Sequence, residues 1–124
     1  MESGLRINVE EWSEKASVTI FHLRGWLDAQ SEEQFLGTAR DAYTKGARQL
    51  LIDLAEVETL TSAGMRAIQK VYKIFTPEEE QFKIARVKMC NAPPQIYHVL
   101  GITGFLQNIP NYESTQAALD SFNG

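Results

Sequence analysis

Alternation of apolar and polar residues predicts β-strands in the first part of the chain. Between Leu5 and Val9 every second side chain is apolar, which is typical of a strand with one exposed face. The segment Ser17–Leu23 is rich in β-branched and aromatic residues and predicts a second strand. The polar segment Glu11–Lys15 between them is short enough for a hairpin connection, so the chain is expected to open with a β-hairpin.

Three later segments also have the character of strands. Gln49–Leu54 is a short and nearly continuous apolar run, as expected for a strand that is buried on both faces. Phe82–Val87 alternates again and predicts a fourth strand, whereas Leu106–Ile109 carries a weaker signal for a final one. A sheet of four to five strands is therefore expected.

Apolar residues at helical spacing predict two longer helices between these strands. Ser31, with a glutamine three positions later, has the signature of a capping box, so a helix is expected to begin there and to end near Lys45. A second helix is predicted from about Ser62 to Phe75, and Pro77 ends it. The first helix is expected to bury one stripe of side chains, namely Phe35, Leu36, Ala39 and Tyr43.

Two shorter helices are predicted in the last third of the chain. Asn91 stands as a capping residue before prolines that suit a first helical turn, so a helix is expected over Pro94–Leu100, and Ser114–Phe122 predicts a terminal helix. A hairpin followed by repeated strand–helix units implies a mixed sheet whose parallel part is covered by helices. The predicted fold class is α/β, with a mixed sheet of four to five strands and about four helices in a single domain spanning residues 1–124.

Composition and charge narrow the function classes without naming one. The chain has 124 residues, of which 44% are hydrophobic and 23% charged, as in an ordinary globular domain. A net charge of -4 without a clustered basic face argues against direct binding of nucleic acid. The first residues lack the pattern of a signal peptide, and no apolar run approaches the roughly 20 residues that a membrane span needs. We therefore expect a cytoplasmic protein without a membrane span.

The motifs of common enzyme classes are missing from the sequence. It contains neither a Gly-rich phosphate loop nor a metal-binding His-Glu-x-x-His motif. His22 lies within an apolar strand and is expected to have a structural role. Cys90, the single cysteine, has no second cysteine to pair with and is expected to be inert. No catalytic residue, metal site or cofactor is predicted, and the chain is not expected to be an enzyme.

One segment places a serine where a negative charge would be stabilised. Ser62 lies after a buried strand and at the predicted start of a helix, where unpaired backbone N–H groups and the helix dipole favour an anion. A phosphate on Ser62 would be tolerated there and would add about two negative charges to the surface. The alternative from spacing alone is simple capping of the helix by Ser62 or Thr61, which contributes about 1 kcal/mol.

Four motifs, in order along the chain, resemble the STAS domain, the fold shared by anti-sigma factor antagonists and the cytoplasmic tails of sulfate transporters. Val18–Ala29 is similar to the family's second strand, which ends in a Gly-x-Leu-Asp turn. Leu51–Leu54 is similar to its hydrophobic-Asp-Leu central strand, and Thr61–Met65 falls where antagonists carry Asp-Ser-Ser-Gly-Leu or Asp-Ser-Thr-Gly-Leu. Val99–Phe122 is similar to the family's Leu-x-x-x-Gly-Leu turn, short strand and final helix.

The resemblance implies an anti-sigma factor antagonist rather than an enzyme. In such antagonists the unphosphorylated form binds an anti-sigma factor with serine kinase activity and frees the sigma factor. Phosphorylation ends this binding and a serine phosphatase restores it, so that transcription is regulated by partner switching. Carried over to this chain, the phosphoacceptor is Ser62. The residues expected to contact the partner surround it and include the neighbouring loop: Thr61, Ala63, Gly64, Met65, Arg66, Gly25, Trp26, Leu27 and Asp28.

Three positions depart from the family's pattern. They are Thr61 in place of an aspartate, Ala63 in place of a second serine or threonine, and Arg66 in place of a glycine. Arg66 lies one helical turn after Ser62, and because helical side chains lean towards the N-terminus it could hold a phosphate on that serine. The alternative is a solvated basic stripe that Arg66 forms with Lys70 and Lys73.

Two other functions stay open at this point. A STAS subunit of a larger assembly, such as a stress-signalling scaffold or a transporter-associated protein, would bind its partners constitutively and without phosphorylation. A small enzyme or nucleotide-binding protein would instead use the helix start at Ser62 as a phosphate site. The absence of a catalytic base near Ser62 in the sequence weighs against this last class.

Overall fold

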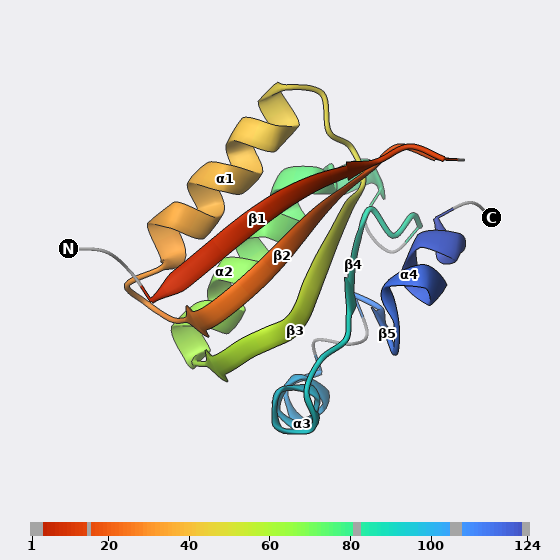
Figure 1. Ribbon diagram of the computed structural model, residues 1–124. Helices are drawn as coiled ribbons and strands as arrows, with labels where there is room; N and C mark the ends of the chain where they lie inside the picture. Colours follow the sequence, from red (N-terminus) through yellow and green to blue (C-terminus); the bar gives the residue numbers. More distant parts are fainter. Residues whose placement is uncertain (1–3, 15, 81–82, 105–107, 123–124) are drawn as a thin grey trace.

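The structure is a computed structural model that describes residues 4–14, 16–80, 83–104 and 108–122, and it consists of a five-stranded sheet with four α-helices packed around it (Figure 1). This is the mixed α/β architecture that the sequence predicts. In chain order the elements are β1 (Leu5–Trp12), β2 (Val18–Leu27), α1 (Glu32–Thr44), β3 (Leu50–Leu60), α2 (Ser62–Phe75), a 3-10 turn (Glu78–Glu80), β4 (Val87–Cys90), α3 (Pro94–Ile102), β5 (Asn111–Tyr112) and α4 (Thr115–Ser121).

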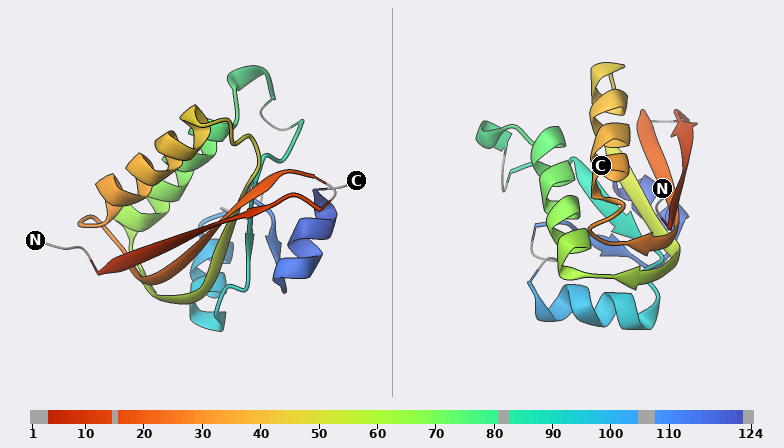
Figure 2. Two further views of the ribbon diagram at one scale, coloured as in Figure 1. Left: turned by 45° about the horizontal axis from the view of Figure 1, so that its top comes forward. Right: turned by 90° about the vertical axis from the view of Figure 1, so that its left-hand side faces the viewer.

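The strands lie in the order β1-β2-β3-β4-β5. β1 and β2 form the predicted antiparallel hairpin, and every later pair of neighbours is parallel. Parallel neighbours need crossover connections, and α1 and α2 provide two of them side by side on one face of the sheet (Figure 1). α4 packs on the opposite face beside β4 and β5 (Figure 2).

Strand alternation divides the apolar residues between these two faces. On β2, Phe21 and Leu23 pack into the larger core beneath α1 and α2, whereas Val18 and Ile20 pack into a smaller core beneath α4. The central strand β3 follows the same rule and is buried on both faces at its start, as predicted from its continuous apolar run.

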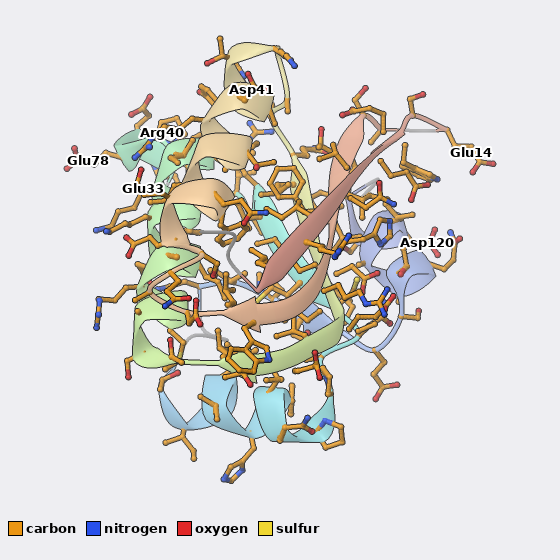
Figure 3. All side chains as sticks on the ribbon, turned by 60° about the vertical axis from the view of Figure 1, so that its left-hand side comes forward. Glu14, Glu33, Arg40, Asp41, Glu78 and Asp120 are labelled. Carbon is orange, nitrogen blue, oxygen red and sulfur yellow. The ribbon has the colours of Figure 1, made fainter. Side chains whose placement is uncertain are left out.

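Helix α1 has the expected division into an apolar and a polar face. Of its predicted stripe, Phe35, Leu36 and Ala39 are buried, and Tyr43 is half-buried with its ring 5.4 Å from that of Phe75. The charged side chains of Glu33, Arg40 and Asp41 point away from the sheet (Figure 3). Burial of one face against the sheet, rather than helix propensity alone, stabilises such a helix.

The fourth strand lies later in the sequence than predicted. β4 covers Val87–Cys90 instead of Phe82–Val87, and Phe82 itself lies outside the described residues. The reason is its pairing partner, because β4 runs beside the first four residues of β3, where both faces of the sheet are covered and all four β4 residues are buried. The described residues directly before it, 83–86, form no strand, and Lys83 and Ile84 among them are exposed.

The final strand and the last two helices were predicted with different accuracy. β5 is a two-residue strand at Asn111–Tyr112, so the prediction at Leu106–Ile109 was wrong at residues 108 and 109, while 106 and 107 lie outside the described residues. The helix predicted over Pro94–Leu100 is confirmed and continues to Ile102. The terminal helix is also confirmed, with Ser114 as its N-cap accepting a hydrogen bond from Ala117 N.

Candidate functional site

The predicted phosphoacceptor lies at the first position of α2, directly after β3. Thr61 is the N-cap residue, and its hydroxyl oxygen accepts a hydrogen bond from Gly64 N at 3.2 Å. Ser62 follows as an exposed residue whose hydroxyl makes no hydrogen bond within the described part of the chain. The two capping alternatives are therefore resolved: Thr61 caps the helix, and Ser62 is free of that task.

A close backbone approach seats the start of α2 against the end of β2. Thr61 N donates a hydrogen bond to Leu27 O at 3.1 Å. A Cβ added to Gly64 would lie 2.1 Å from the same carbonyl oxygen, far inside van der Waals contact. Only glycine leaves room for this approach, which fixes the position of Ser62 relative to the end of β2.

A second glycine shapes the end of β2. Gly25 has a φ of +102°, and a Cβ there would lie 2.0 Å from Gly4 O. The next residue, Trp26, donates its backbone N–H to Gly4 O at 3.0 Å, while its side chain is 52% exposed. The backbone at this end is thus fixed by two tight contacts, and it holds a large aromatic side chain in solvent.

The loop between β2 and α1 is stabilised from within by Ser31 and Asp28. The Ser31 hydroxyl is fully buried, accepts a hydrogen bond from Asp28 N at 2.9 Å and lies 3.1 Å from Trp26 O, to which it can donate. The Asp28 carboxylate accepts hydrogen bonds from Gln30 N and Ser31 N, both at 3.1 Å. These bonds hold the loop in one conformation.

The capping box predicted at Ser31 was wrong. Ser31 precedes α1 as expected, but its backbone is helical and its side chain makes no capping bond. The hydroxyl is used by the loop before it, and the Gln34 amide donates instead to Leu5 O on β1 at 3.0 Å. The two side chains needed for reciprocal capping are therefore engaged with other elements.

The predicted partner-binding residues come together at one end of the molecule, where β2 and β3 end and α2 begins (Figure 1). They fall into three groups by burial. The buried residues, which position the backbone, are Gly25, Leu27, Ala63 and Gly64. The half-buried ones are Thr61, Met65 and Asp28, and the exposed ones are Trp26, Ser62 and Arg66. We call Trp26, Ser62 and Arg66 the exposed tip.

Of the three basic residues expected to form a stripe along α2, one takes part in an ion pair. Lys70 forms an ion pair with Glu32 of α1, so its charge is compensated and the pair links the two helices. Arg66 and Lys73 are exposed and make no ion pair within the described residues. Arg66 is thus available to a negative group on Ser62, one helical turn away.

A polar network that the sequence did not predict lies on the sheet face opposite α1 and α2. His22 Nδ1 lies 2.7 Å from Asp53 Oδ2, and His22 Nε2 lies 2.7 Å from Glu10 Oε1. Both neighbours are carboxylate acceptors, so both ring nitrogens must carry hydrogen for the two contacts to be hydrogen bonds. Partial burial lowers the pKa of His22, but the hydrogen bonds and charges of Glu10 and Asp53 outweigh it and raise that pKa above its ordinary value.

The network continues through Asn91 towards α4. The Asn91 amide donates to Asp53 Oδ1 at 3.0 Å and to Thr115 Oγ1 at 2.9 Å, and its backbone has a φ of 59°. Asn91 was predicted to cap α3, and this was wrong, because Pro93 takes the N-cap position and the Asn91 side chain is used by the network. His22 has the structural role predicted for it, but the sequence could not show which residues of the neighbouring strands would face it.

Cys90 is buried beside this network. Its burial, together with the negative charge of Asp53, raises the pKa of the thiol to about 12. A thiol with such a pKa is almost entirely protonated near neutral pH, which fits the inert role expected for it. Within the described residues, no group of three His, Cys, Asp or Glu side chains could hold a metal ion. None of the described helices has the length and apolar character needed to cross a membrane.

Comparisons with known proteins find similarity in sequence and in fold. The family model described as the STAS domain matches residues 11–118. The candidate anti-sigma factor antagonist BtrV of Bordetella bronchiseptica is 27% identical over 100 residues, which cover 81% of this chain and 82% of BtrV.

Solved structures share the fold. A candidate anti-sigma factor antagonist from Thermotoga maritima superimposes with a TM-score of 0.78 at 16% identity, covering 93% of this chain and 92% of the other. The anti-sigma factor antagonist SpoIIAA in its unphosphorylated form gives a TM-score of 0.74 at 16% identity, covering 96% of this chain and 97% of SpoIIAA. Bacillus SpoIIAA in its phosphorylated form gives 0.68 at 14% identity, covering 94% and 99% of the two chains.

Proposed function

Because the chain belongs to the STAS domain family, we propose that it acts as an anti-sigma factor antagonist in the cytoplasm. In its unphosphorylated form it binds an anti-sigma factor that is also a serine kinase, and the sigma factor is released. Phosphorylation of Ser62 by this partner ends the binding, and a serine phosphatase restores it. The likeness to BtrV and to the SpoIIAA structures, one of which is the phosphorylated form, supports this proposal.

The observation that carries the proposal is the exposed Ser62 hydroxyl at the start of α2. A kinase needs a hydroxyl that solvent can reach, and Ser62 is exposed while Thr61 performs the capping that would otherwise occupy it. The first helical turn offers backbone N–H groups and the positive end of the dipole to the phosphate. The modified residue is therefore compatible with the fold.

The switch works through the surface around Ser62. Trp26 and Ser62 belong to the same end of the molecule, so a partner that covers the exposed aromatic ring also approaches the serine. A phosphate there adds about two negative charges, and removing them from water in an interface costs more than the contact returns. Phosphorylation is thus expected to stop binding without unfolding the protein.

The proposal is tested by replacing Ser62 with aspartate and measuring binding to the purified anti-sigma factor kinase of the same organism by titration calorimetry. Ser62→Asp is expected to abolish binding, and Ser62→Ala to retain it. Ser13→Asp is the matched control, because it adds the same charge at an exposed position in the hairpin turn, at the opposite end of β2. Circular dichroism verifies that all three variants are folded.

Unchanged affinity of Ser62→Asp would overturn the switch. It would favour a STAS subunit that binds constitutively within a larger assembly. Such an outcome would explain why the chain has Thr61 where the family's motif has an acidic residue.

A further inference from the structure

The strand β1 forms one edge of the sheet. β1 is an eight-residue strand at one end of the sheet, and among the described strands only β2 pairs with it (Figure 2). Gln34 of α1 donates to the Leu5 carbonyl at the beginning of this edge. The stretch of β1 that follows is a ready template for another strand.

The register of the hairpin shows which backbone groups point outwards. Trp26 N donates to Gly4 O, and the ladder continues without a shift to Trp12 opposite Val18. Since hydrogen-bonded and non-hydrogen-bonded pairs alternate in an antiparallel ladder, the even-numbered residues of β1 bond to β2. The odd-numbered residues Ile7 and Val9 therefore direct their N–H and C=O groups to the free edge.

The side chains of β1 are complementary to themselves about Asn8. We propose that two copies of the chain pair their β1 strands in antiparallel fashion, with Asn8 facing Asn8 of the partner subunit. In this register Ile7 exchanges two backbone hydrogen bonds with Val9 of the partner subunit, and the symmetric pair forms two more. The overlap runs from Arg6 to Glu10 and joins two five-stranded sheets into one.

The pairing accounts for two features of the isolated chain. Val9 is 46% exposed although it is an aliphatic side chain on a strand, and in the pair it lies beside Ile7 of the partner subunit. Arg6 lies opposite Arg24 on β2 and has no ion-pair partner within the described residues. In the pair it faces Glu10 of the partner subunit, which places an opposite charge beside the Arg6 guanidinium.

This surface is independent of the exposed tip. The pairing uses the edge of β1, whereas the proposed switch uses the start of α2. Failure of either proposal therefore leaves the other intact, because dimerisation is measured on the purified chain alone.

The charge pairing is tested by sedimentation velocity over a range of protein concentrations. The wild type is expected to shift from monomer to dimer as its concentration rises. Arg6→Glu is expected to associate at least roughly tenfold more weakly, because two attractive charge pairs become repulsive. Glu10→Arg is expected to have the same defect. A mixture of the two variants restores association, because one chain then carries two acidic side chains at positions 6 and 10 and the other carries two basic ones. Each position 6 thus faces an opposite charge at position 10 across the mixed pair.

Folding controls accompany the Glu10 variant, because Glu10 also contacts His22. Arg6→Glu carries the test alone if Glu10→Arg is unfolded by circular dichroism. Ile84→Lys, at a residue 45% exposed on another surface, is the control for Val9→Lys, and only Val9→Lys should weaken association. A wild type that stays monomeric at all concentrations, or an association that Arg6→Glu leaves unchanged, would overturn the proposal.

Cross-linking tests the register. Residues on the two-fold axis of a non-hydrogen-bonded pair have Cα atoms about 4.5 Å apart, within the range of a disulfide. Asn8→Cys should therefore give a covalent dimer under mild oxidation, while Arg24→Cys, on the same face but one strand inward, should not. The native Cys90 is buried and does not interfere. Cross-linking of Val9→Cys but not Asn8→Cys would contradict this register.

Discussion

Ser31 and Ser62 both stand where a strand gives way to a helix, and the fold uses their hydroxyl groups in opposite ways. The Ser31 hydroxyl is fully buried and bonded to the loop backbone at Asp28 and Trp26. The Ser62 hydroxyl is exposed and has no hydrogen-bond partner within the described residues, because Thr61 caps the helix beside it. The first serine stabilises the structure, and the second is available for chemistry.

The two hydroxyl groups differ in their use because the serines occupy different positions relative to the N-cap of the helix. Ser31 takes the position before α1, whereas Ser62 lies one position inside α2 and leaves the cap to Thr61. The two serines are linked through the end of β2, since the Leu27 carbonyl receives Thr61 N and the Trp26 carbonyl lies beside the Ser31 hydroxyl. One buried serine thus helps to hold the loop against which the exposed serine is placed.

The greatest loss of stability is expected from a substitution at Gly64, where α2 packs against the Leu27 carbonyl. Gly64→Ala places a Cβ 2.1 Å from Leu27 O, so the helix start must move, and we expect the free energy of unfolding to fall by about 3 kcal/mol. Gly37→Ala is the matched control on α1, with nothing within 4 Å of the added Cβ, and should stabilise by about 0.5–1 kcal/mol. Urea unfolding measures both. Equal stability of the two variants would show that the approach to Leu27 is not rigid.

The two serines are expected to differ in their contribution to stability. Ser31→Ala removes a fully buried hydroxyl and with it the acceptor of the Asp28 N–H, and should lower the free energy of unfolding by about 2 kcal/mol. Ser62→Ala should change it by less than about 0.5 kcal/mol, because the hydroxyl that is removed is exposed and has no hydrogen-bond partner in the part of the chain that the structure describes. Urea denaturation of the two alanine variants tests this contrast. A comparable loss for both would mean that Ser62 has a structural role.

A pH-dependent effect is expected away from both serines, at His22. Since the pKa of His22 is raised in the folded protein, the folded state binds the proton more tightly than the unfolded state. This contribution is present in full below the ordinary value of about 6.5 and is lost as pH rises through the folded pKa. Urea unfolding between about pH 5.5 and about pH 8 should show wild-type stability falling more steeply than that of His22→Gln. Parallel curves would contradict the doubly protonated ring.

The smallest effect concerns Arg66 and phosphorylated Ser62. An exposed ion pair one turn apart contributes about 0.5 kcal/mol, so Arg66→Ala should speed dephosphorylation of Ser62 by roughly two- to threefold. Lys73→Ala, at the other exposed unpaired cation of α2, is the control and should leave the rate unchanged. Time courses with a serine phosphatase measure it. Equal rates for both variants would remove Arg66 from the switch.

Periodicity predicted the helices and the order of the elements, because the apolar stripe of each helix is local information. The position of β4 was not local, since Val87–Cys90 becomes a strand where it meets the doubly covered start of β3. The capping box at Ser31 failed for a similar reason, because its hydroxyl is engaged by the backbone of the preceding loop at Asp28 and Trp26. The contacts of His22 likewise require the registers of β1 and β3 with β2.

The sequence predicted the position of the candidate site more accurately than the contacts that its residues make. The prediction that Ser62 lies at a helix start is confirmed, whereas the strand before it continues to Leu60 and does not end at the predicted Leu54. Its exposure depends on Thr61 taking the cap and on Gly64 packing against Leu27, neither of which spacing alone decides.

The most direct test of the central claim is intact-mass spectrometry with peptide mapping of the protein isolated from its own cells. A single added phosphate is expected on the peptide that contains Ser62 and none on the peptide that contains Ser31. A mass without phosphate across growth and stress conditions, or a phosphate at another residue, would contradict it.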